Sequence, residues 1–205
     1  SGAIDLATLD SSSDAAYPLL AAVTPKLIST LRSKPVTGIY LILNTHDLNE
    51  RANGDRLPSV YLRDLDPDSP PPENNSDLMF ERAPARLVQT QNIATDKAWK
   101  PAITYRSLGA EGLVYSSFQT AYDAETKLDA TAYGHWTTSP YVMNGYDRQA
   151  IAYSLPLILP DGTVYGVVGV ELLTSYLTEK MPYNELHTSN SGSYALCYSD
   201  TTLHA

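Results

Sequence analysis

The sequence predicts an α+β fold in which helices cover a mainly antiparallel sheet. Three observations lead to this class. An apolar pattern with helical spacing runs from Ser12 to Ser33, two runs rich in β-forming residues follow it, and a long apolar hairpin lies between Gln149 and Leu173. A helix followed by strands, further helices and a closing hairpin is typical of an α+β domain.

The composition is that of a folded, acidic chain of 205 residues, long enough to bury a sizeable core. A hydrophobic content of 43% excludes a disordered chain. The net charge of -9 argues against a nucleic-acid partner, because phosphate binding needs clustered lysines and arginines. Fifteen tyrosines against two phenylalanines indicate half-wet surfaces and pocket walls, since a tyrosine joins an apolar body to a polar tip.

The first predicted element is a long N-terminal helix within residues 1–35. The cluster "SSD" offers N-cap residues, and the apolar side chains that follow recur at steps of three and four: Leu19, Leu20, Val23, Leu27, Ile28 and Leu31. Pro18 fits the first turn of this helix, whereas Pro25 is expected to kink or divide it.

The region after this helix predicts two strands and a second helix. The run "VTGIYLILNT" predicts a strand over Gly38–Asn44, and "PSVYLRDLDP" predicts another around Val60–Arg63. Ser76 is expected to cap a helix over "SDLMFERAPARLVQTQN", interrupted by Pro84. The section from Trp99 to Tyr122 is expected to mix helix and loop.

The clearest pattern is the hairpin "QAIAYSLPLILPDGTVYGVVGVELL", whose arms are joined by Pro160-Asp161-Gly162. Gly162 suits the positive-φ position of the turn. In the first arm, Ile151, Tyr153, Leu155 and Leu157 alternate with Ala152 and Ser154, which predicts a half-buried antiparallel strand. The segment "TSYLTEKMP" then predicts a short helix that leaves the sheet.

A search for chemistry finds no catalytic, metal or cofactor motif, such as G-x-S-x-G, a P-loop, H-E-x-x-H or C-x-x-C. We therefore expect no catalytic residue, no metal and no cofactor. The four histidines lie far apart in sequence: His46, His135, His187 and His204. Cys197 is the single cysteine, so an internal disulfide is excluded, and no neighbouring cation is placed to activate its thiol.

Two acidic features, a run of three aspartates and a single glutamate, have alternative interpretations. Asp64, Asp66 and Asp68 imitate the start of a calcium loop, but the sixth and twelfth positions hold Ser69 and Asn75 instead of Gly and Glu, which favours an ordinary turn. Glu171 ends an apolar run, so its carboxylate either faces water at a sheet edge or is an acceptor aimed into a pocket.

The hairpin and the segment "YGHW…SPY" before it carry a resemblance to a known family. "AIAYSLPLILPDGTVYGVVGVELLTSYL" resembles the last two strands of a Cache domain, the extracellular PAS-like sensor module of bacterial receptors. The resemblance covers about residues 12–186 and is most specific in the hairpin. It implies a PAS-like antiparallel sheet of about five strands in the membrane-distal half of a double Cache module, here residues 36–186. Residues 187–205 would then open a truncated membrane-proximal half.

The same resemblance implies a ligand site between the sheet and the segment that crosses over it. In amino-acid-binding members, this places Trp136, Tyr141 and Glu171 at binding positions, with Asn144 or Asp147 as the middle acid. Gly134 stands where such members have an arginine that holds the ligand carboxylate. The crossing segment and the hairpin would complete the wall with Tyr133, His135 and Tyr153. A neutral, aromatic or cationic metabolite suits these residues better than an amino acid held in the usual way.

The function that follows is a non-enzymatic, extracytoplasmic small-molecule sensor clipped from a bacterial membrane receptor. Its output would be a histidine kinase or a diguanylate cyclase, and its N-terminal helix would carry signal and homodimer contacts, although the apolar stripe of this helix could instead pack on the sheet. Two alternatives remain. One is a soluble extracytoplasmic binding protein, and the other is a hydrolase that uses His135 and Glu171 as an acid–base pair.

Overall fold

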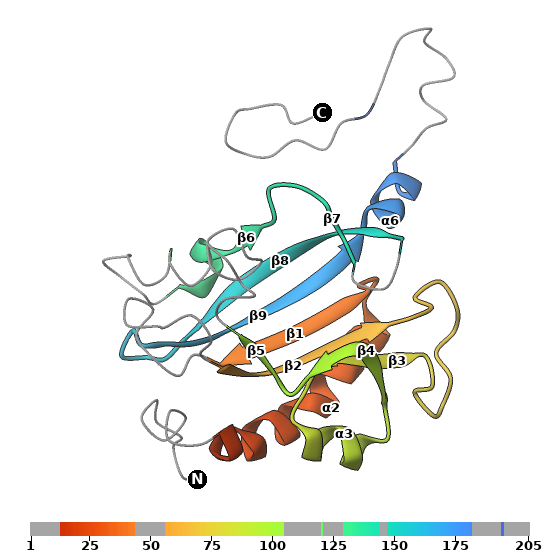
Figure 1. The fold of residues 1–205 in the computed structure, drawn as a ribbon. Coiled ribbons are helices and arrows are strands. Elements are labelled where there is room, and N and C mark those ends of the chain that lie inside the picture. Colours follow the sequence, from red (N-terminus) through yellow and green to blue (C-terminus); the bar gives the residue numbers. More distant parts are fainter. Residues whose placement is uncertain are drawn as a thin grey trace, which may run out of the picture.

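The structure is a computed structural model, and it describes residues 13–43, 56–104, 120, 129–143, 147–181 and 194. The fold is mixed, with helices packed against one large sheet (Figure 1). Asn144, Cys197 and nearly all of the expected membrane-proximal segment lie outside the described residues.

The N-terminal helix exists but is shorter than the predicted segment. A 3-10 turn, η1, covers Ser13–Ala16, and α2 covers Tyr17–Ser33. Pro25 lies inside α2 and does not divide it, so of the two expected effects division is ruled out. Pro25 is on the exposed side of the helix, where water can bond the carbonyl that loses its N–H partner.

The sheet is larger than the predicted five strands, since the described residues form nine. They are β1 (Gly38–Leu43), β2 (Arg56–Asp64), β3 (Leu78–Arg82), β4 (Ala94–Lys100), β5 (Ala102–Thr104), β6 (His135–Trp136), β7 (Tyr141–Val142), β8 (Gln149–Ile158) and β9 (Val164–Leu173). The strand order is β4-β3-β2-β1-β9-β8-β6, while β5 pairs with β2 and β7 pairs with β8. In this sheet order, each neighbouring pair from β3 through β2, β1, β9 and β8 to β6 is antiparallel, whereas β4 and β3 pair in parallel.

The predicted helix after Ser76 is wrong in its first half. Leu78–Arg82 forms β3, and the helix α3 begins only after Pro84, at Ala85–Gln91. Leu78, Met79, Phe80 and Glu81 are all buried in the sheet beside β2, so tertiary packing overrides the local helical pattern. Trp99, expected in a mixed helix and loop section, lies in β4.

The strand β4 is the last strand at its end of the described sheet, and its backbone is partly occupied by side chains. The Ala98 N–H donates to Asp96 Oδ1 at 2.5 Å, and Arg82 donates to the Ala98 carbonyl at 3.3 Å. Both polar groups of this residue are therefore used within the same chain.

The hairpin is confirmed. β8 and β9 pair over nine positions, and Gly162 has a φ of 87° in the turn. Ala152 and Ser154 are fully buried, whereas Tyr153, Leu155 and Leu157 are half-buried, so the strand is covered on both faces rather than on one. The short exit helix is also confirmed as α6, Thr174–Glu179.

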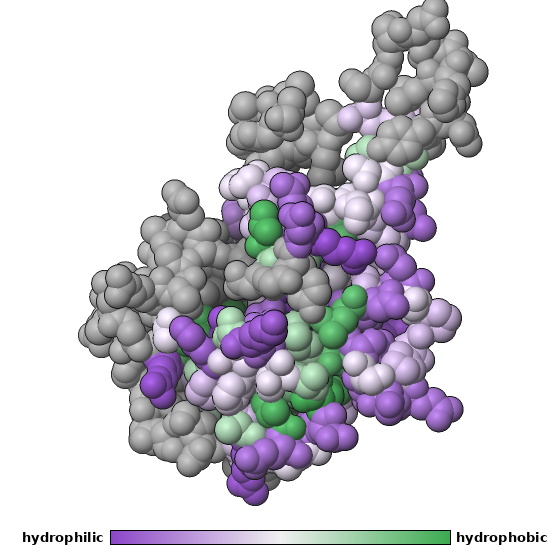
Figure 2. Space-filling view, turned by 45° about the vertical axis from the view of Figure 1, so that its right-hand side comes forward, coloured by the Kyte–Doolittle hydropathy of each residue, from purple (hydrophilic) through white to green (hydrophobic). Residues whose placement is uncertain are grey.

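The two faces of the sheet differ in what they bury. One face carries Tyr40, Tyr61 and Glu171, and we call it the tyrosine face. The opposite face, the helix face, packs on α2 in one core cluster: Leu20, Leu27, Leu31, Ile39, Leu41, Leu43, Val60 and Leu62. The apolar stripe of α2 thus packs on the sheet of its own chain. In Figure 2, hydrophilic residues cover much of the visible surface, and apolar residues gather in a band near its centre.

Candidate functional site

Glu171 lies on β9 at the middle of the tyrosine face and has no exposed surface. The register places it beside Gly38 on β1 and Ala152 on β8. These small neighbours leave the carboxylate room, since a Cβ at Gly38 would lie 2.3 Å from Glu171 Oε2. Glu171 therefore does not face water at a sheet edge, which excludes the first of the two interpretations from sequence; its carboxylate is a buried acceptor.

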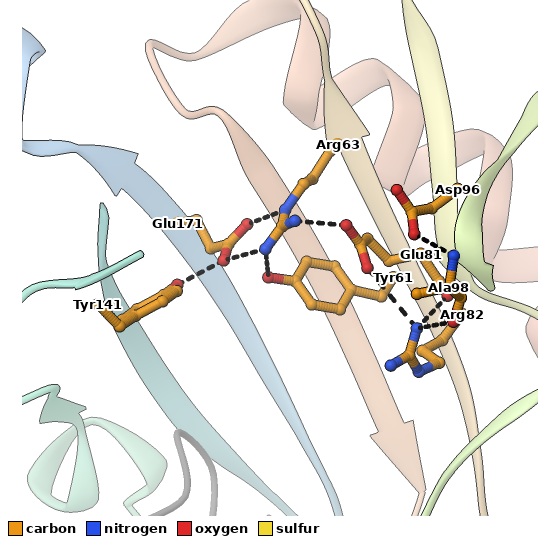
Figure 3. Close-up of polar contacts among 8 residues, drawn as sticks. All are labelled: Tyr61, Arg63, Glu81, Arg82, Asp96, Ala98, Tyr141 and Glu171. Carbon is orange, nitrogen blue, oxygen red and sulfur yellow. Dashed lines mark hydrogen bonds and ion pairs between the residues drawn. The ribbon is translucent and has the colours of Figure 1, made fainter. Parts of the chain in front are cut away.

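Arg63, on β2, is the cation that neutralises this carboxylate. Its Nε lies 2.9 Å from Glu171 Oε2, and a second nitrogen lies 3.1 Å from Oε1, which is a two-pronged ion pair (Figure 3). The remaining terminal nitrogen, Nη1, donates to Glu81 on β3, and Nη2, which bonds Glu171 Oε1, also donates to Tyr61 Oη at 3.1 Å. Arg63 is 3% exposed. Its burial works against the charge, but Tyr61, Glu171 and Glu81 outweigh it and raise the pKa of Arg63.

Tyr141, on the short strand β7, is partly buried and completes a row of polar side chains. Its hydroxyl donates to Glu171 Oε1. Burial, reinforced by the neighbouring Tyr61 and Glu171, raises the pKa of Tyr141 above its ordinary value, so the hydroxyl keeps its proton. We call Tyr141, Glu171, Arg63 and Glu81 the buried polar row; it joins β7, β9, β2 and β3 across the sheet (Figure 3).

A second polar contact lies beside this row. Tyr40 Oη and Ser154 Oγ are 2.7 Å apart, and both side chains are buried. The Tyr40 ring lies over Gly169, where a Cβ would come within 2.2 Å of the ring carbon Cζ. The Tyr40 ring also meets the Tyr61 ring edge-on, with centroids 5.4 Å apart. Tyrosine rings and their hydroxyls thus cover much of this face.

The strand register sorts the predicted site residues between the two faces. Tyr133 packs on the cluster around Tyr40, and His135 lies opposite Ser154, so both join Tyr141 and Glu171 on the tyrosine face. Trp136 lies opposite Tyr153, with their ring centroids 4.8 Å apart, on the helix face. The structure therefore does not bring Trp136 and Tyr153 together with Glu171. Asp147 is exposed.

Gly134, the position that lacks the expected arginine, lies against Tyr153. A Cβ there would fall 1.8 Å from Tyr153 Oη, so no larger side chain fits at this position without a shift. The cation of the site is Arg63 instead, which the sequence analysis missed. A signal was present, because an arginine inside the strand "SVYLRDL" must find a buried acceptor if that strand is central.

The acid–base pair of the hydrolase alternative is not in place. His135 and Glu171 share a face, but two strand spacings and two residues separate them, roughly 12 Å between Cα atoms. Both oxygens of Glu171 already accept from Arg63 or Tyr141. Burial lowers the pKa of His135. Before Glu171 could act as a base, its carboxylate would have to break its ion pair with Arg63.

The acidic run at Asp64 has a structural role. Asp64 accepts from the Asp66 N–H at 2.9 Å and pairs with Arg32 at 3.4 Å. Arg32 also pairs with Asp77, and Asn75 Oδ1 accepts from it at 3.1 Å. In the described ranges, no group of three or more His, Cys, Asp or Glu residues could hold a metal ion.

The Arg32–Asp77 pair makes the contribution of Asp77 to stability depend on pH. Its hydrogen bond with Arg32 lowers the pKa of Asp77. A lowered carboxylate pKa adds stability that is present above the unfolded value of ~3.9 and is lost as the pH falls through the folded value. Urea unfolding of wild type and Asp77→Asn should therefore differ more at pH 7 than at pH 3. An equal difference at both pH values would contradict this assignment.

No helix in the part of the chain that the structure describes is both long and apolar enough to cross a membrane. No protein-family model matches the chain, and no curated protein matches it. Among solved structures, the chain is similar to the extracellular domain of a candidate histidine kinase, with 17% sequence identity and a TM-score of 0.36. The match covers 79% of this chain and 45% of the other, so the chain spans less than half of that domain.

Proposed function

We propose that this chain is the small-molecule-sensing part of an extracytoplasmic receptor domain, and that its ligand binds on the tyrosine face. The observation that carries the proposal is the buried polar row. A row of charges inside a sheet contributes less to stability than apolar packing of the same volume would. Such clusters of perturbed titratable groups are candidates for function rather than for stability alone.

The arrangement of the two faces supports the same proposal. The helix face packs on α2 through an apolar core, whereas the tyrosine face collects hydroxyls, an imidazole and the row. The central strands are antiparallel, as the resemblance of the hairpin to Cache domains implies. In the receptor, α2 would carry the signal toward a kinase or cyclase output, and its outward residues, such as Ala22 and Ser29, would face a dimer partner.

The ligand would be a neutral or cationic metabolite. Glu171 is already paired with Arg63, so a ligand carboxylate would find no free cation among the described residues of the buried polar row. The ligand contacts would fall to Tyr133, His135 and Tyr141, of which His135 and Tyr133 stand beside the Tyr40 cluster.

A thermal-shift screen tests the site with two neighbouring variants. The panel would hold free amino acids, primary and quaternary amines, and neutral sugars. A ligand at ~100 times its Kd should raise the Tm by several degrees, because it stabilises the folded state by about 2.7 kcal/mol. His135→Ala should lose this shift, and Trp136→Ala, its neighbour on the opposite face, should keep it. Loss in Trp136→Ala alone, or no loss in either variant, would refute a site on the tyrosine face.

A further inference from the structure

The strand β3 contacts α2 through the residues on both of its flanks. Just before β3, Asp77 pairs with Arg32 in the last turn of α2. Four residues after β3, in α3, the Arg86 guanidinium lies 4.4 Å from the centroid of the ring of Tyr17, the first residue of α2. A strand held to both ends of a helix is expected to move with that helix.

The centre of β3 is also the end of the buried polar row. Glu81 is 2% exposed and pairs with Arg63, while Arg82 places a guanidinium nitrogen 3.6 Å from its other oxygen. Every link of the row is a charged or charge-assisted hydrogen bond; the bonds of Arg63 to Glu171 and Glu81 are buried, and the bond of Tyr141 to Glu171 is partly buried. Displacing Arg63 would leave Glu171 and Glu81 without the cation that they share, and displacing Tyr141 would remove a hydrogen bond from Glu171, so we expect the four side chains to shift together.

We propose that the buried polar row couples the position of β7 to the position of β3 and, through the residues that flank β3, to the position of α2. A shift of β7 would move Tyr141 and, through its hydrogen bond, Glu171. Arg63, which reaches Glu171 across β1, would then transmit the shift to Glu81 on β3. A movement of β3 would in turn reach α2 through the contacts at Arg32 and Tyr17. The meaning of this coupling as a signal rests on the proposed function, but the coupling itself is a property of the protein without ligand.

A double-mutant cycle between the two ends of the row tests the coupling. Tyr141 and Glu81 contact different partners, so independent effects of Tyr141→Phe and Glu81→Gln on the unfolding equilibrium constant should multiply to within about twofold. Coupling predicts that the double variant departs from that product by more than about fivefold. Tyr40→Phe is the matched control, since it removes a buried hydroxyl bonded to Ser154, outside the row. Its cycle with Glu81→Gln should stay within twofold.

A second measurement, amide hydrogen exchange, uses the single variant Tyr141→Phe. Tyr141→Phe should speed amide hydrogen exchange in β3 and in the last turn of α2, and Tyr40→Phe should leave both segments near the wild-type rate. Multiplicative effects in the Tyr141–Glu81 cycle, or faster exchange confined to β7, β8 and β9, would refute the coupling. Because no ligand enters either measurement, a failure here is distinct from a failure of the thermal-shift screen.

Discussion

Replacing Arg63 with methionine is expected to lower the free energy of unfolding by about 3–5 kcal/mol, because the change leaves Glu171 and Glu81 buried without their cation. Urea unfolding followed by circular dichroism measures the loss. Arg148→Met is the matched control, since Arg148 pairs with Asp68 at 3.9 Å on an exposed surface and should cost at most about 1 kcal/mol. A loss at Arg63 no larger than the loss at Arg148 would contradict the role given to the ion pairs.

The triple variant Arg63→Met, Glu81→Met and Glu171→Met separates stability from function. Removing a whole buried ion cluster in favour of apolar side chains is often neutral or stabilising. The triple variant should therefore recover most of the stability that Arg63→Met loses, measured by the same urea titration. If it is less stable than Arg63→Met, the row stabilises the fold on its own account, and the reason for assigning it a function falls away.

Gly169→Ala is expected to destabilise the protein by about 1–3 kcal/mol through overpacking. In an open strand position, alanine would be the better residue by about 0.5–1 kcal/mol. Here the new methyl group would lie 2.2 Å from Tyr40 Cζ and 2.3 Å from its hydroxyl oxygen, and that buried ring lies over Gly169 of β9 and meets the Tyr61 ring edge-on. Thermal or urea unfolding reports the change.

The partner variant Tyr40→Leu identifies the cause. Leucine is shorter than tyrosine, so Gly169→Ala should cost clearly less in the Tyr40→Leu background than in wild type. Equal costs in both backgrounds would place the strain at some contact other than the Tyr40 ring.

Local patterns were enough to predict β1, the core of β2 and the β8–β9 hairpin. Each is a run of β-branched, aromatic and leucine residues, and the hairpin turn has a glycine where the backbone needs positive φ. β3 was mistaken for a helix because "LMFER" has no period of its own in five residues. Its burial beside β2 and β4 is decided by contacts distant in sequence. The short strands β6 and β7 have two residues each, too few for any periodicity to appear.

Of the buried polar row, the sequence analysis singled out Tyr141 and Glu171 and missed Arg63 and Glu81. Tyr141 and Glu171 were singled out and do touch, although Glu171 is bound by Arg63, which lies 108 residues earlier in the sequence. Trp136 and His135 are adjacent in sequence, and the alternation of a strand sends their side chains to opposite faces. Which of the two shares a face with Glu171 depends on the register of β6 against β8, and a single sequence does not specify that register.

The occupied backbone of Ala98 in β4 has a consequence for how these molecules meet one another. An outer strand with free N–H and C=O groups is a template on which another copy can add a strand, and repeated addition leads to aggregates. Asp96 takes the Ala98 N–H and Arg82 takes its carbonyl, while Lys97 and Lys100 place positive charge along the same strand. A strand of a second copy would find the N–H and the carbonyl of Ala98 already bonded. If that strand were another β4, the lysines of the two strands would also repel each other. At this end of the described sheet, the polar groups of β4 are therefore expected to disfavour edge-to-edge addition of a second copy.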